Sequence, residues 1–172
     1  LQVSGLGKKF SASLFEDVNL QASGEEKIGL IGDNGSGKST ILKILGGRES
    51  VDEGRIVWSK EAKIGFLEQE IVSDTYKVSG GEKKILRLAE LFYGDYNVLL
   101  LDEPDNHLDR EHKDWFGRLV DDFPGMVVVI SHDRNFLSHG ISRTWLLEEK
   151  RVSDYAFGYS KFRSIYEQEM TT

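Results

Sequence analysis

The residues from Gly32 to Thr40 have the types and spacing of a phosphate-binding site. They read G-D-N-G-S-G-K-S-T and fit the pattern G-x-x-x-x-G-K-[ST]. Glycines let successive backbone N–H groups turn toward one point, where an anion can sit. The lysine adds a positive charge for the β- and γ-phosphates, and the serine hydroxyl after it can ligate Mg²⁺. The pattern predicts binding of a nucleoside triphosphate by Gly32, Asn34, Gly35, Ser36, Gly37, Lys38, Ser39 and Thr40.

Two carboxylates follow the apolar run Val98–Leu101. Ligands of open α/β sheets bind at the carboxyl ends of the strands, so these two side chains would lie near the phosphate loop. Asp102 can hold Mg²⁺, directly or through water, opposite Ser39. Glu103 would face the γ-phosphate and act as the general base for the attacking water. A carboxylate after a strand is more often a solvated loop residue, but a phosphate loop in the same chain favours the catalytic interpretation.

Two other polar side chains follow apolar runs in the same way. Gln69 comes after Lys63–Leu67, and His132 comes after Met126–Ile130. If these runs are parallel strands, both side chains lie at the same edge of the sheet as the carboxylates. His132 could then hydrogen-bond the γ-phosphate, although a single histidine is more often a surface or structural residue.

An aromatic residue upstream of the phosphate loop could contact the base of the nucleotide. Every base has a π-face on which an aromatic ring can stack. Phe10 is suitably placed in the sequence, and a position in the hydrophobic core is an equally good interpretation. For Phe15 the core is the better interpretation.

The segments around the phosphate loop are those needed to position it. Lys27–Ile31 is a short apolar run of the kind found in buried parallel strands. Thr40–Leu45 spaces its apolar residues as a helix does and stops at Gly46. A strand, a glycine loop and a helix in this order bring the helix N-terminus to the phosphate.

The rest of the chain alternates between strand-like and helix-like segments. Strands are predicted at 1–3, 14–15, 18–20, 55–58, 63–67, 98–101, 126–130 and 143–147. Helices are predicted after an N-cap at Ser79, at 110–122 and at 159–169. This order predicts an α/β fold with a mainly parallel central sheet and an antiparallel β part at the N-terminus.

Length and composition are those of one globular domain. The chain has 172 residues, of which 39% are hydrophobic and 30% charged. There is no cysteine, which excludes disulfides and thiolate metal sites. The formal net charge of -7 argues against a surface that binds nucleic acid all over. No apolar stretch is long enough to cross a bilayer and the N-terminus is not signal-like, so we expect no membrane insertion and a cytoplasmic location.

The motifs occur in a fixed order along nearly the whole chain. They are the phosphate loop, Gln69, Ser79-Gly80-Gly81-Glu82, Leu99–Pro104, Asn106–Asp109 and Ser131–Asp133. Together they resemble the nucleotide-binding domain of an ATP-binding cassette (ABC) ATPase, whose signature sequence matches Ser79–Glu82. The resemblance implies a P-loop NTPase fold of the ABC type, ATP and Mg²⁺ as ligands, and hydrolysis of ATP to ADP and phosphate.

The resemblance also implies a role for each motif. Phe10 would stack on adenine, Gln69 would reach Mg²⁺ and the attacking water, and His132 would be the switch histidine. The signature would contact the γ-phosphate of ATP held by a second cassette, through Ser79, Gly80, Gly81 and Glu82. The D-loop would cross the interface between the cassettes, and it consists of Asn106, His107, Leu108 and Asp109.

Two motifs are similar to the ABC-F subfamily, whose members act on ribosomes. They are Asn106–Asp109 and Ser131–Leu137; membrane transporters more often have Ser-Ala in place of the Asn-His pair. The resemblance implies that ATP closes two cassettes and that hydrolysis reopens them on the ribosome. Residues 1–157 would form the cassette, and 158–172 would begin the linker to another. Contacts with rRNA would use elements that this sequence lacks.

The sequence departs from the family pattern at several positions. Asp105 stands where this branch usually has Thr, Val78 replaces Leu, and Ile85 stands where Arg is typical. The signature follows Gln69 after only a short stretch, 70–78, where the family has a helical subdomain. Either this subdomain is deleted or the sequence skips a segment. We favour the second interpretation because loss of the subdomain would leave the signature helix without support.

Three other interpretations stay open. The ATP-binding subunit of a membrane transporter would share these motifs, and a chromosome-associated ATPase of the SMC type has a long insertion before its signature. A nucleotide-binding module without turnover is the third, although Glu103, Gln69 and His132 are all present. An isolated cassette is expected to hydrolyse ATP slowly, because a partner completes its γ-phosphate site.

Overall fold

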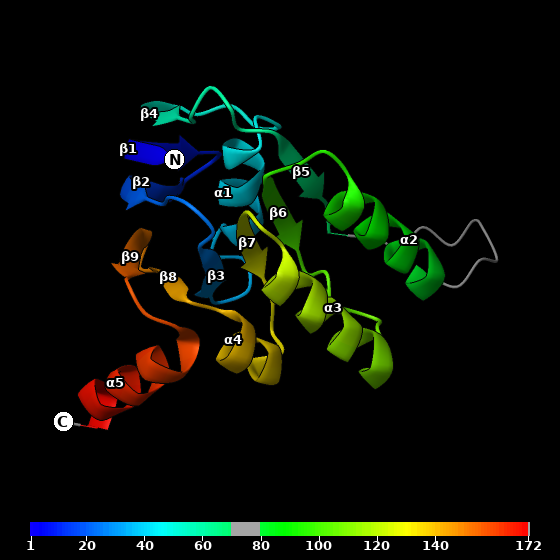
Figure 1. The fold of residues 1–172 in the computed structure, drawn as a ribbon. Helices are drawn as coiled ribbons and strands as arrows, with labels where there is room; N and C mark the ends of the chain where they lie inside the picture. The colour runs from blue at the N-terminus through cyan, green and yellow to red at the C-terminus, as the bar shows by residue number, and fades with distance from the viewer. Residues whose placement is uncertain (70–79, 172) are drawn as a thin grey trace.

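The computed structural model describes residues 1–69 and 80–171, and its central element is a six-stranded sheet (Figure 1). The strands lie in the order β5-β6-β7-β3-β8-β9, and all neighbours are parallel except β8 and β9. The prediction of a mainly parallel sheet is confirmed. Its strands are β3 (Lys27–Gly32), β5 (Ile64–Leu67), β6 (Val98–Asp102), β7 (Met126–Ile130), β8 (Arg143–Glu148) and β9 (Arg151–Tyr155).

A second, antiparallel sheet comes from the N-terminal part of the chain. Its order is β2-β1-β4, formed by β1 (Gln2–Lys9), β2 (Ser13–Gln21) and β4 (Glu53–Val57). Helix α1 (Lys38–Leu45) lies between this sheet and the parallel one (Figure 1). One hydrophobic core fills this layer and includes Leu6, Phe15, Ile41, Leu100 and Val128. The core interpretation of Phe15 is confirmed, since its side chain is fully buried.

The other face of the parallel sheet carries the remaining helices. They are α2 (Gly80–Tyr93), α3 (Arg110–Asp122), α4 (Arg134–Gly140) and α5 (Tyr159–Thr171). In β6, Leu99 and Leu101 belong to the core under these helices, whereas Leu100 belongs to the core around α1. Successive strand residues point to opposite faces, so a strand covered on both sides needs an unbroken apolar run. None of the helices in the described residues is long and apolar enough to cross a membrane.

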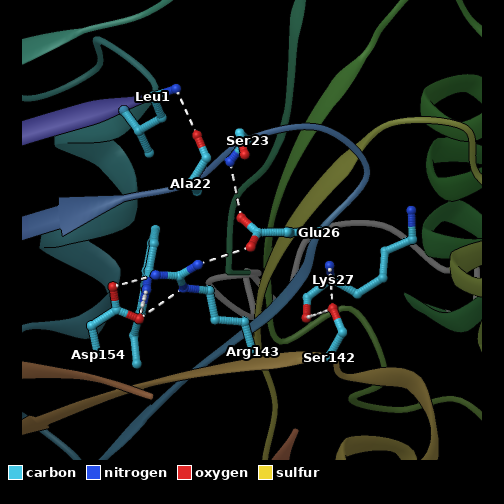
Figure 2. Close-up of polar contacts among 9 residues, drawn as sticks. Leu1, Ala22, Ser23, Glu26, Lys27, Ser142, Arg143 and Asp154 are labelled. Atoms are coloured by element: carbon cyan, nitrogen blue, oxygen red, sulfur yellow. Dashed lines mark hydrogen bonds and ion pairs between the residues drawn. The ribbon is translucent and has the colours of Figure 1, made fainter. Parts of the chain in front are cut away.

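Arg143 joins three segments at the end of the sheet where β3 and β8 begin (Figure 2). Its Nη1 donates to Oε1 of Glu26 at 2.8 Å, and its Nε and Nη2 donate to the two carboxylate oxygens of Asp154 at 2.8 and 2.7 Å. The hydrogen bonds and charge of Asp154 raise the pKa of Arg143, with Glu26 adding to the effect. This bidentate pair holds β9 against β8, and Glu26 connects it to the start of β3.

The structure extends some predicted elements and adds two. β2 is one strand where the sequence predicted two pieces, and α1 begins at Lys38 inside the phosphate-binding pattern. Helix α4 and strand β9 were not predicted. The β8–β9 hairpin turns through Glu149 and Lys150, whose φ angles are 48° and 63°, so the usual Asn-Gly signal is missing. The N-cap predicted at Ser79 lies outside the described residues.

Candidate functional site

The phosphate loop connects the end of β3 to the start of α1, and two of its three glycines combine a positive φ angle with a close contact. Gly32 has φ 150°, and a Cβ there would lie 2.3 Å from the carbonyl oxygen of Leu147. Gly37 has φ 111°, and a Cβ there would lie 2.8 Å from Cγ of Leu14. The chain therefore turns into α1 in a conformation and a space that only glycine accepts.

Lys38 is the first residue of α1, and its side chain bends back over the loop. Its Nζ donates to the carbonyl oxygens of Gly32 and Asp33, both at 2.7 Å. Burial lowers the pKa of Lys38, while the nearby carboxylates of Glu103, Asp33 and Asp102 act in the opposite direction. The ammonium group is thus held inside the loop, where it can meet a phosphate oxygen.

Asp102 ends β6 below the loop and is 1% exposed. Neither of its carboxylate oxygens has a hydrogen bond of good geometry in the described part of the chain. Burial raises its pKa, and the Ser39 hydroxyl beside it acts in the opposite direction. A buried, unsatisfied carboxylate beside a hydroxyl fits a hard cation. Among the described residues no three His, Cys, Asp or Glu side chains form a metal cluster, and Mg²⁺ needs none because it keeps water and phosphate ligands.

Glu103 is the next residue, and three side chains meet at its carboxylate. The Gln69 amide donates to Oε2 at 3.0 Å, the Asn106 amide donates to the same oxygen, and Nε2 of His132 lies 3.3 Å from Oε1. The backbone of Glu103 is left-handed, with φ 50°. Such a conformation is costly for a non-glycine residue and is typical of functional sites. The predicted residues Glu103, Gln69 and His132 are therefore brought together.

A cavity of about 650 Å³ is lined by the phosphate loop and by Phe10. The Phe10 side chain is 63% exposed, and Nζ of Lys8 lies 5.2 Å from the centre of its ring. A larger cavity of about 710 Å³ lies between α3 and α4, but it contains none of the phosphate-loop residues. We take the cavity of about 650 Å³ as the site because its lining combines the phosphate loop with the predicted catalytic side chains. Its lining residues are Phe10, Leu14, Asn34, Gly35, Gly37, Lys38, Ser39, Thr40, Gln69, Glu103, Ile130 and His132.

Among the described residues, neither the predicted signature nor the D-loop lines this cavity. Gly80, Gly81 and Glu82 form the first turn of α2, and the cavity lining includes no residue from the described part of that helix. Ser79 lies outside the described residues. In the D-loop, Leu108 is buried, and His107 has a left-handed backbone with φ 64°.

The other two D-loop residues have definite contacts. Asp109 caps α3 by accepting the His112 N–H at 2.9 Å. The amide of Asn106 donates to the carboxylate of Glu103 in its own chain, and its predicted place at an interface with a second cassette stays a prediction. This contact depends on the turn after β6 and has no signature in the sequence.

Two contacts behind the site were also missed by the sequence analysis. Nζ of Lys84 donates to backbone carbonyls of Glu103 and Asn106. The hydroxyl of Ser131 donates to Asp105 at 2.7 Å, and burial raises the pKa of Asp105. The sequence did contain one signal for the Lys84 contacts. Lys84 lies four residues before Leu88, which is buried, and residues four apart share one face of a helix, so Lys84 lies on the inner face of α2.

The fold and the loop between β3 and α1 define a phosphate-loop nucleotide-binding domain. The ABC transporter family model matches residues 15–72 and 58–106, which together cover more than half of the chain. The chain therefore belongs to the ATP-binding cassette family. This confirms the family resemblance drawn from the motifs.

Two curated relatives are similar to the chain over most of its length. The ribosome protection protein VmlR of Bacillus subtilis (strain 168) is 31% identical over 182 residues, covering 93% of this chain and 33% of VmlR. The ATP-binding protein Uup of Escherichia coli (strain K12) is 29% identical over 199 residues, covering 90% of this chain and 31% of Uup. Both are of the ABC-F type. The chain spans about a third of the length of these relatives.

Solved structures bear out the fold. RNase-L Inhibitor superimposes with a TM-score of 0.82 at 21% identity, covering 98% of this chain and 42% of that one. At this level of identity the likeness concerns the fold alone. The prediction of an ABC-type nucleotide-binding domain is confirmed.

Proposed function

We propose that this chain binds ATP with Mg²⁺ and hydrolyses the ATP to ADP and phosphate. The observation that carries the proposal is the convergence of Lys38, the unsatisfied Asp102 and the Glu103 carboxylate at one end of the sheet. A cation for the phosphates, a ligand for the metal and a base for water are what phosphoryl transfer to water requires.

Each side chain has one task in this proposal. Backbone N–H groups of the phosphate loop and Lys38 bind the β- and γ-phosphates, and Phe10 stacks on the adenine. Mg²⁺ would be held by Ser39 and Asp102, with Gln69 reaching toward it, and it would neutralise charge on the phosphates. Glu103 accepts a proton from the attacking water, and His132 hydrogen-bonds the γ-phosphate.

A second cassette would complete the site. The lining of the cavity comes from the phosphate loop, the start of α1 and the strand ends, and α2 with its signature contributes nothing to it in the described residues. We infer that Gly80, Gly81, Glu82 and Ser79 act on ATP bound to another cassette, with the D-loop between the two. The isolated chain should turn over slowly, and its rate per molecule should rise with protein concentration.

The partner we propose beyond the second cassette is the ribosome. The support is the ABC-F-like motif Asn106–Asp109 and the similarity to VmlR, a protein named for ribosome protection. ATP would close the two cassettes and hydrolysis would reopen them, in the cytoplasm. Residues 158–172 would begin the linker. The alignments with VmlR and Uup are longer than this chain, so they contain gaps, and a segment missing near 70–78 would account for such gaps.

The test is ATP hydrolysis by the protein that contains this chain, with and without purified ribosomes. Glu103→Gln should abolish turnover and trap an ATP-dependent complex that sediments with ribosomes. The matched control is Glu25→Gln, an exposed carboxylate at the opposite end of the sheet, which should behave as the wild type. A rate of ATP hydrolysis that purified ribosomes do not change, together with copurification of a membrane protein, would overturn the ribosomal role in favour of a transporter subunit.

A further inference from the structure

The side chain of Lys84, on α2, is buried, although its charged ammonium group would be better solvated at the protein surface. The residue is 3% exposed, and lysine is rarely buried to this extent. Its Nζ donates to the carbonyl oxygen of Glu103 at 3.1 Å and to that of Asn106 at 3.0 Å. Both acceptors belong to the loop after β6, so one side chain joins the helix that begins at the signature to the loop that carries the proposed base.

The backbone of Glu103 needs such support. Its φ of 50° is uncommon for a residue with a side chain and persists only where the surroundings hold it. The Glu103 N–H donates to the Ile130 carbonyl at 2.9 Å, and the Glu103 carbonyl accepts from the Asn106 N–H at 3.3 Å. The ammonium group of Lys84 adds a charge-assisted hydrogen bond to the same carbonyl, and such bonds are stronger than neutral ones.

We propose that Lys84 is a positioning residue, which holds Glu103 in its left-handed conformation and ties its loop to α2. This inference rests on the proposed function of Glu103 as the base. The direction of a side chain follows from its backbone, so loss of the tether would let the carboxylate leave the position where Gln69 and His132 meet it. A merely structural lysine would instead hold α2 to the sheet.

The tether also has a consequence for a pair of cassettes. The first turn of α2 carries Gly81 and Glu82, which the proposed function sets against ATP of the partner cassette. Lys84 is on the next turn and contacts the loop of the base in its own chain. Because of this contact, a shift of α2 would be transmitted to the Glu103 loop.

Amide hydrogen exchange tests the tether without any need for turnover. In Lys84→Met, the amides of Glu103 and Asn106 should exchange at least about tenfold faster, while amides in the second half of α2 keep their wild-type rates. Lys84→Arg should restore part of the protection because it keeps a charged donor. Lys83→Met, an exposed neighbour on the same helix, is the control and should change neither region.

Two results of this exchange experiment would overturn the inference. One is unchanged protection of the Glu103 loop in a folded Lys84→Met protein. The other is equal acceleration along all of α2, which would mean that Lys84 only packs the helix. If the methionine variant does not fold, Lys84→Gln is measured in its place, with the same expectations.

Steady-state ATP hydrolysis tests whether loss of the Lys84 contacts affects catalysis. Lys84→Met should lower kcat about tenfold and leave KM for ATP within about twofold, because the phosphate loop and Phe10 are untouched. A raised KM with wild-type kcat would contradict a positioning role. If the wild type shows no hydrolysis, the proposed function fails, and the exchange experiment still decides whether Lys84 fixes the loop.

Discussion

Replacement of Asp102 by asparagine should stabilise the metal-free protein and weaken its response to Mg²⁺ and ATP. Asp102 is 1% exposed, and neither oxygen has a well-formed hydrogen bond in the described residues. Without a cation, the folded protein holds a poorly compensated negative charge there. Asn keeps the shape and removes the charge, but it is a weaker ligand for Mg²⁺.

The size of the effect follows from the burial. A buried polar group without a partner costs about 1–3 kcal/mol, and more if it is charged. Because the Asn amide also lacks partners, removing only the charge should gain about 1–2 kcal/mol. For a domain of this size that corresponds to a rise in Tm of about 2–8 °C. With Mg²⁺ and ATP at about 100 times Kd, the wild type should gain about 2.7 kcal/mol and Asp102→Asn much less.

The gain in stability of metal-free Asp102→Asn over the wild type should depend on pH. Burial raises the pKa of Asp102 in the folded chain above the unfolded value. The folded wild type therefore binds this proton more tightly than the unfolded chain, and it gains stability as the pH falls through that raised pKa. The difference in stability between the two proteins is full at pH values above that raised pKa and disappears below the ordinary aspartate value of 3.8.

Thermal unfolding in EDTA and in Mg²⁺ with ATP measures both effects. The order of Tm should reverse between the two conditions, with Asp102→Asn higher in EDTA and the wild type higher with nucleotide. Asp122→Asn, an exposed carboxylate at the end of α3, is the control and should follow the wild type. A metal-free Asp102→Asn protein that melts below the wild type would refute this reasoning.

Three other substitutions have definite expected outcomes. Gly32→Ala should lose about 1–3 kcal/mol in urea unfolding because its Cβ would meet the Leu147 carbonyl; wild-type stability would contradict the loop geometry. Phe10→Ala should weaken ATP binding about tenfold or more and leave inorganic triphosphate unaffected; equal losses for both ligands would argue against stacking. Arg143→Met should lower the free energy of unfolding by about 1–3 kcal/mol without changing the Kd for ATP, and a changed Kd would mean that the two ends of the sheet are coupled.

The strands that support the site could be read from the sequence because they are buried on both faces. The runs 98–101 and 126–130 became β6 and β7, and each is followed by the side chain that the sequence singled out. The β9 hairpin was missed because its turn residues, Glu149 and Lys150, carry no turn signal. The short helix α4 was missed as well, although Asp133 caps it by accepting the N–H groups of Asn135 and Phe136.

The sequence by itself determined the phosphate loop, the carboxylates at the end of β6 and the family, since spacing along the chain defines each of these. Only the tertiary structure decided what surrounds Glu103. Gln69, Asn106 and His132 come from separate segments and meet there because β5, β6 and β7 are neighbours in the sheet. The link from Lys84 depends on how α2 packs on that sheet. Packing of distant segments is fixed by burial of the whole core, which no local spacing reveals.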